Sequence, residues 1–148
     1  MCSPPCTLRS LAAVLSPTSS TIRLFLHVLA ASVWVGGQLT LAGLVPTVRK
    51  AAPDATKAVA NAFARIAWPA FAVAVATGLW NLMEVDITDT SSSYQATVGL
   101  HLTLAILSGV FAAVHALGNS VAAKAIGGGL GALAAIGALF LGVLLRTA

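Results

Sequence analysis

The sequence predicts an all-α fold, an integral membrane four-helix bundle with up-down topology. Two observations lead to this prediction. Of the 148 residues, 58% are hydrophobic and only 8% are charged, and the apolar residues gather in four long runs. A soluble domain carries about 25% charged residues, whereas a membrane-spanning helix needs about 20 apolar ones. No run alternates polar and apolar residues as a barrel strand does, so the expected surroundings of the chain are a lipid bilayer.

The four runs place helices at about 22–46, 58–83, 95–117 and 125–146. The first is expected to end at Pro46, because proline has no backbone N–H to continue a helix. The second is most apolar from Ile66 onward, and the third follows a polar link. The fourth contains only Ala, Gly, Ile, Leu, Val and Phe between Ala125 and Leu145. Short links make successive helices antiparallel neighbours, so 22–148 should form one domain after a flexible lead, 1–21.

The charges predict an orientation in a cytoplasmic membrane. The link at 84–94 carries three acids and no base, whereas the other two links and the start of the second helix carry five bases: Arg49, Lys50, Lys57, Arg65 and Lys124. The termini contribute three bases, Arg9, Arg23 and Arg146, so the bias is five against three. Since basic residues stay on the cytoplasmic side, we expect the acidic link and both termini outside. The net charge of +4 does not predict nucleic-acid binding, because the bases are scattered between apolar runs.

Cys2 and Cys6 form a Cys-x3-Cys pair in the lead. Two exposed thiols could bind a soft metal ion. The alternative is that they belong to an unstructured tail and bind nothing.

Polar residues inside two of the expected helices form narrow stripes. Successive helical residues turn by about 100°, so Trp34 and Gln38 lie within about 20° of His27 on the first helix. On the third helix, Ser108 and His115 lie within about 40° of His101. Such side chains are costly in lipid and usually face a bundle interior. We expect the two stripes to face each other or a bound group.

Depth singles out two of the histidines. His27 and His101 lie five to six residues into their helices, about 8–9 Å below the same membrane surface at 1.5 Å per residue. Two neutral imidazoles at one level suit a copper ion or the iron of haem b. Arg65 and His115 are expected near the inner surface, where they could hold an anionic group such as a haem propionate or simply bond to each other and to the interface. Trp34 could cover a porphyrin, and Gln38 and Ser108 could instead be hydrogen-bonding contacts between helices.

The sequence carries no motif for hydrolytic chemistry. It has no Ser-His-Asp set, no paired carboxylates and no H-E-x-x-H, so an enzyme is the less favoured class. Small residues at four-residue steps in the fourth helix predict close helix packing: Gly127, Gly131 and Ala135, with Ala134, Ala138 and Gly142. These seams serve packing within one bundle or allow a homodimer or a partner membrane subunit.

The stretch from His27 through Trp34-Val-Gly-Gly to Pro46 resembles the first helix of the copper resistance protein D (CopD) family. Three further segments are similar to the second and third helices of that family: Arg65-Ile-Ala-Trp-Pro, Thr77-Gly-Leu-Trp, and Tyr94 through His115. The resemblance covers about 25–115 and implies copper uptake or tolerance at the cytoplasmic membrane. HemJ-type protoporphyrinogen oxidases show a similar layout, with a haem-associated lysine at the position that His101 occupies here. A histidine keeps an axial ligand but argues against the oxidase activity.

Three hypotheses follow. The first is a CopD-type protein that binds copper or haem through His27 and His101 and acts in copper handling. The second is a haem b-binding membrane redox protein with the same two ligands. The third is a non-catalytic accessory subunit whose polar stripes only set the helix register.

Overall fold

The computed structural model describes residues 16–147. Their long elements are helices, in the order α1 (Ser19–Ala51), α2 (Ala55–Met83), a 3-10 turn η1 (Ile87–Asp89), α3 (Ser92–Leu117) and α4 (Val121–Thr147). This part of the chain contains no strand, which confirms the all-α prediction. The predicted Cys2–Cys6 pair lies outside the described residues.

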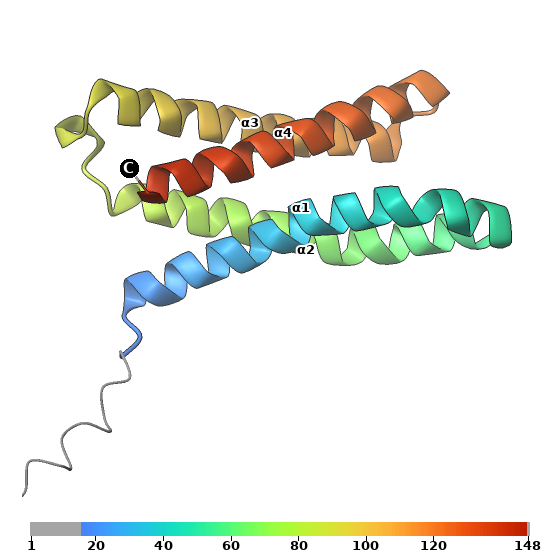
Figure 1. Ribbon diagram of the computed structural model, residues 1–148, viewed down its shortest axis with the longest axis horizontal. Coiled ribbons are helices and arrows are strands. Elements are labelled where there is room, and N and C mark those ends of the chain that lie inside the picture. Colours follow the sequence, from blue (N-terminus) through green and yellow to red (C-terminus); the bar gives the residue numbers. More distant parts are fainter. Residues whose placement is uncertain (1–15, 148) are drawn as a thin grey trace, which may run out of the picture.

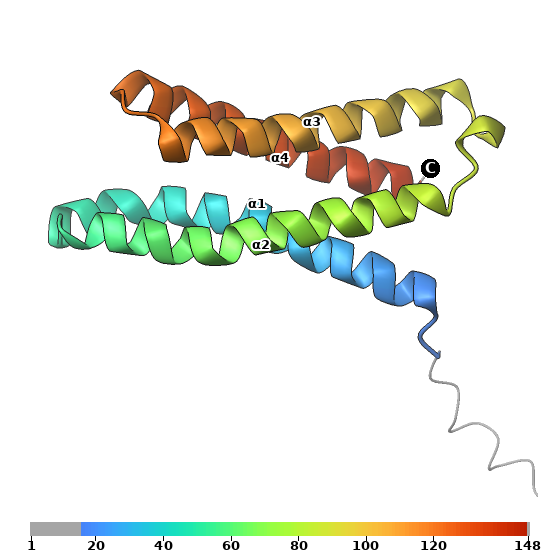
Figure 2. The same ribbon diagram turned by 180° about the vertical axis from the view of Figure 1, so that it is seen from behind.

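The helices form two antiparallel hairpins that lie in two layers. Figures 1 and 2 show α1 beside α2 in one layer and α3 beside α4 in the other, with α4 against α1. The α1–α2 and α3–α4 links lie at the same end of the molecule, and η1 lies at the opposite end (Figure 1). The direction of the chain therefore alternates from helix to helix, as expected for an up-down arrangement.

All four helices are long and apolar enough to span a membrane. Large apolar side chains point outward along their whole length, among them Phe25, Ile66, Ile106 and Phe140. A soluble monomer rarely exposes so much contiguous apolar surface, whereas lipid tails solvate it without cost. The structure thus describes a protein suited to a bilayer.

The first helix is longer at both ends than the sequence predicted. It begins at Ser19, because the Thr18 hydroxyl accepts a hydrogen bond from the Thr21 N–H and the Thr21 side chain accepts one from Thr18 N–H in return. It also continues through Pro46 to Ala51, so the expected end at Pro46 was wrong. Proline removes one backbone hydrogen bond, but ending the helix there would leave up to four carbonyls unpaired, which is worse in an apolar medium.

The predicted small-residue seam of α4 is confirmed as its packing face. Five of its members are buried: Gly127, Gly131, Ala134, Ala135 and Ala138. A Cβ atom on Gly127 would come within 2.6 Å of the His115 backbone nitrogen and 2.7 Å of the Phe111 oxygen. The backbones of α3 and α4 therefore touch at Gly127, and the seam is used inside the chain.

An aromatic cluster joins the two hairpins near the middle of the molecule. The Trp34 ring lies 4.5 Å from the Phe71 ring and 5.5 Å from the Trp68 ring, centroid to centroid. Ala135 of α4 packs on the same cluster. A Cβ atom on Gly109 of α3 would come within 2.6 Å of Phe71. All four helices therefore meet at this level.

Candidate functional site

His27 of α1 and His101 of α3 lie next to each other between the two hairpins. Their ring centroids are 6.4 Å apart and their planes are tilted by 59°. Both residues are partly buried. The predicted convergence of these two imidazoles is therefore confirmed, although 74 residues of sequence separate them. Whether they bind a ligand stays a prediction.

The contacts of His27 fix which of its ring nitrogens carries the proton. Nδ1 lies 2.9 Å from the carbonyl oxygen of Ala74 and 3.2 Å from the Thr77 hydroxyl. A carbonyl can only accept, so Nδ1 is the protonated nitrogen and donates to it. Thr77 Oγ1 itself donates to the Val73 carbonyl at 2.6 Å. The other ring nitrogen, Nε2, keeps its lone pair.

His101 is held in the same way by the second hairpin. Its Nδ1 lies 2.8 Å from the carbonyl oxygen of Ala138 in α4, so it too donates through Nδ1 and keeps the lone pair of Nε2. Metal-ligating histidines commonly donate their other ring N–H to a backbone carbonyl or a carboxylate, which orients the ring and fixes the tautomer. The two imidazoles therefore have the hydrogen bonding typical of metal ligands.

The separation of the rings fits a single metal ion between them. Ring centroids 6.4 Å apart would leave room for one ion bonded to both imidazoles, at about 2.0 Å for each metal–nitrogen bond. Within residues 16–147, no group of three or more His, Cys, Asp and Glu side chains could hold a metal ion. The donor set here is thus two imidazoles. It suits an ion that needs only two protein ligands, or an ion whose remaining ligands belong to a bound molecule.

Trp34 and Ser108, which the sequence placed on the two polar stripes, pair with each other. The Trp34 indole N–H donates to Ser108 Oγ at 3.2 Å, and the two residues are 5% and 1% exposed. Ser108 in turn donates to the Ala105 carbonyl at 2.8 Å. They lie seven residues beyond the histidines, about 10 Å deeper along the helices. This contact closes the interior below the histidine pair.

Gln38 turns back onto its own helix, where its side-chain amide donates to the Trp34 carbonyl at 3.1 Å. Within the described residues it forms no hydrogen bond with His27 or His101.

Arg65 and His115 are both exposed, and no hydrogen bond joins them in the part of the chain that the structure describes. His115 Nδ1 instead lies 2.6 Å from the Lys124 carbonyl of α4. His115 is fourteen residues beyond His101, about 21 Å along α3, so it lies outside the proposed centre. The two residues thus form no direct hydrogen bond in the described part of the chain, and their binding of an anionic group stays a prediction.

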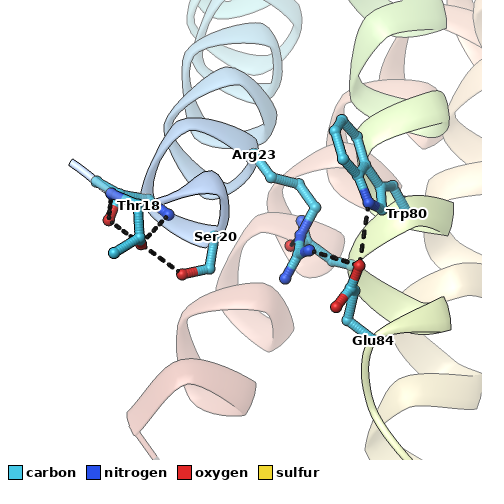
Figure 3. Close-up of polar contacts among 7 residues, drawn as sticks. Thr18, Ser20, Arg23, Trp80 and Glu84 are labelled. Carbon is cyan, nitrogen blue, oxygen red and sulfur yellow. Dashed lines mark hydrogen bonds and ion pairs between the residues drawn. The ribbon is translucent and has the colours of Figure 1, made fainter.

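A polar cluster above the histidines was not anticipated from the sequence (Figure 3). Arg23, one turn before His27 on α1, donates through Nε to Asn81 at 2.7 Å and lies 3.2 Å from the Glu84 carboxylate. Its guanidinium also lies 5.7 Å from the Trp80 ring centroid, and Trp80 donates to Glu84 at 3.3 Å. The one sequence signal was that Trp80 and Glu84 lie four residues apart, on one helix face. The cluster joins α1 to α2 at the end nearer His27 and pairs the charge of Arg23 with that of Glu84.

Comparison of the chain with family models, with curated proteins and with solved structures finds no match. The functional argument therefore depends on the chain's own residues.

Proposed function

We propose that this chain is a multi-pass protein of the cytoplasmic membrane that holds copper or haem iron between His27 and His101 and acts in copper handling. The observation that carries the proposal is the pair of imidazole rings 6.4 Å apart, each donating through Nδ1 to a helix carbonyl. The resemblance to the CopD family is what points to copper handling in particular.

The chemistry of the donors supports this proposal. Imidazole nitrogen is a good ligand for copper and iron, and the backbone hydrogen bonds leave Nε2 of each ring free to coordinate. Two neutral ligands do not cancel the charge of the ion, so a copper ion held here keeps a tendency to leave for a more strongly donating site. That property suits a protein that passes copper on better than one that stores it.

A second candidate function, a haem b-binding redox protein, is favoured by the number of ligands. His27 and His101 would hold the haem iron through Nε2, since each Nδ1 is bonded to a helix carbonyl. When bound, haem supplies one-electron redox chemistry. The Trp34–Ser108 contact, about 10 Å deeper, would form the inner wall of its site.

Purification in detergent tests these proposals against the accessory-subunit hypothesis. We expect the protein to retain either stoichiometric copper or a Soret absorption band, and to lose it in His27→Ala and in His101→Ala. His115→Ala is the matched control, because this histidine is also bonded to a carbonyl of α4 but lies far from the pair. A folded wild-type protein that takes up neither supplied Cu(I) nor haemin would contradict both metal hypotheses and favour the accessory role.

We further propose that the acidic link and both termini lie on the outer, non-cytoplasmic side of the membrane. The helix ends beside the two links that share one end of the molecule (Figure 1) carry bases of the predicted cytoplasmic side: Arg49 and Lys50 in α1, Lys57 in α2 and Lys124 in α4. At the other end, Arg23 is paired with Glu84. Arg146 in the last turn of α4 is a second base at that end, so the larger share of the basic charge lies at the end that the positive-inside rule assigns to the cytoplasm.

A further inference from the structure

All three histidines of the chain are held by the same local arrangement. Each Nδ1 donates to a backbone carbonyl of the neighbouring helix in its hairpin, and a glycine follows that carbonyl by four residues. The carbonyl and glycine are Ala74 and Gly78 for His27, Ala138 and Gly142 for His101, and Lys124 and Gly128 for His115. We call each such carbonyl and glycine a histidine seat.

The glycine has a direct physical role in the seat. In a helix the carbonyl of residue i accepts the N–H of residue i+4, and the side chain of a helical residue lies over the turn before it. A side chain at i+4 would therefore cover the second lone pair of that carbonyl. Glycine leaves the lone pair open to an imidazole from another helix.

The distances show that the histidine rings occupy this space. A Cβ atom would come within 3.0 Å of His27 Cε1 if built on Gly78, and within 3.2 Å of His101 Cε1 if built on Gly142. Built on Gly128 it would come within 2.9 Å of His115 Nδ1.

Other helical glycines do not lie against an imidazole. Built on Gly36, Gly43, Gly99 or Gly129, a Cβ atom meets nothing within 4 Å, and on Gly37 or Gly109 it meets a phenylalanine ring, that of Phe63 or Phe71. What sets the seat glycines apart is therefore the histidine ring bonded to the carbonyl four residues earlier.

The seats also reveal an equivalence between the two hairpins. In each, the first helix supplies the histidine and the second supplies the carbonyl and the glycine: α1 with α2 for His27, and α3 with α4 for His101. The two rings that meet at 6.4 Å thus come from matching positions of two matching halves. No such repeat is visible in the sequence, because Ala74-Val-Ala-Thr-Gly78 and Ala138-Leu-Phe-Leu-Gly142 share only their end residues.

We propose that Gly78 and Gly142 are positioning residues of the metal centre. By leaving the Ala74 and Ala138 carbonyls open, they fix the Nδ1–H tautomer of His27 and His101 and present both Nε2 lone pairs for coordination. The seat itself is a property of the metal-free chain, whereas its role in metal binding rests on the function proposed above.

The test begins with the metal-free protein in detergent micelles, labelled with 15N in its three histidines. Near neutral to mildly alkaline pH, we expect NMR to show all three in the Nδ1–H form, with signals assigned from single His→Gln variants. Gly78→Val should abolish this preference in His27 alone, and Gly142→Val in His101 alone. If the valine variant does not fold, Gly78→Ala replaces it in the same NMR measurement, because its Cβ atom displaces the His27 ring by only a few tenths of an ångström.

Metal binding is then measured on the same variants with chelator-buffered Cu(I) and with haemin. Loss of a hydrogen-bond partner of a metal-ligating histidine typically lowers affinity about 10–100-fold, and we expect that range for Gly78→Val and Gly142→Val. Gly128→Val should change only the tautomer of His115, and Gly129→Val should change neither quantity.

Two results would overturn the proposal: the Nε2–H form in His27 or His101 of the metal-free wild type, or unchanged affinity in a variant whose NMR spectrum shows the tautomer lost. A different result would be a wild type that shows all three seats by NMR but binds neither Cu(I) nor haemin. That result would contradict the proposed function and, with it, the positioning role, and the seats would then be packing contacts only.

Discussion

Trp34 and Ser108 form a buried polar contact between the two hairpins, and its energetic role can be isolated. Replacing Ser108 with alanine leaves the indole N–H of Trp34 without its acceptor in an apolar interior. Because interhelical hydrogen bonds in membranes contribute about 0.5–2 kcal/mol, we expect Ser108→Ala to lower the free energy of unfolding by about that amount. Unfolding in mixed micelles of increasing SDS content measures it.

Ser32→Ala is the matched control, because Ser32 is exposed and donates only to the Val28 carbonyl of its own helix. It should change the stability little. A double-mutant cycle with Trp34→Phe separates the pair from its surroundings, and a coupling energy near zero would contradict the role assigned to this contact.

Arg23 and Glu84 form an ion pair whose partners should matter unequally. The Arg23 side chain is 11% exposed and also bonds to Asn81, whereas the Glu84 side chain is 54% exposed. We expect Glu84→Gln to cost less than about 1 kcal/mol, with a smaller effect at high salt, since exposed ion pairs contribute little. Arg23→Met should cost more, because it also leaves the Asn81 amide oxygen without its donor.

Unfolding free energies of both variants at low and high salt provide the measurement. Equal costs for the two substitutions, or an Arg23→Met cost that disappears with salt, would show that the ion pair rather than the buried hydrogen bond ties α1 to α2.

At the scale of the helices, the α3–α4 pair depends on the absence of a side chain at one position. A Cβ atom on Gly127 would press on two backbone atoms of α3, which cannot turn aside as a side chain can. Overpacking typically costs about 1–3 kcal/mol, so we expect Gly127→Ala to destabilise the protein by that amount or to separate the two helices. Gly129→Ala, two residues away with nothing within 4 Å, should be neutral or slightly stabilising, because alanine favours the helix.

The same SDS titration compares the two variants. If they were equally stable, the close backbone approach would not contribute to stability in the micelle.

The orientation of the whole molecule can be tested by cysteine labelling. Cys2 and Cys6 are first replaced with serine, and a single cysteine is then introduced at Ser92 or at Asn119, which are exposed at opposite ends of α3. We expect a membrane-impermeant maleimide to label Ser92→Cys in intact cells and Asn119→Cys only after permeabilisation. The reverse pattern would place the termini in the cytoplasm, and labelling of both sites in intact cells would indicate that the chain does not keep one orientation.

Much of the architecture followed from composition and periodicity. The centres of the four helices lie where the apolar runs predicted them, because in lipid a backbone must satisfy its own hydrogen bonds over the full width of the bilayer. That same requirement explains the error at Pro46. The helix continues past a residue that would end it in water, since stopping costs more hydrogen bonds than the proline removes.

The candidate site was predicted in part. The 100° rule placed His27 with Trp34 on one face and His101 with Ser108 on another, and the structure brings these faces together. It could not show that Trp34 would bond to Ser108, that His115 would bond to the Lys124 carbonyl, or that Arg23 would join Glu84. Each of these contacts depends on the rotation and spacing of a neighbouring helix, which a one-dimensional pattern does not contain.

The sequence alone determined the helical class, the four apolar runs and the expected level of the two histidines. These features depend on properties that repeat along a single segment of the chain. Only the tertiary structure decided which nitrogen of each imidazole stays free, because the deciding partners are carbonyls of other helices. A backbone carbonyl exists at every residue, and the carbonyls that accept the imidazoles here are ones that a glycine leaves open and against which a neighbouring helix places a ring.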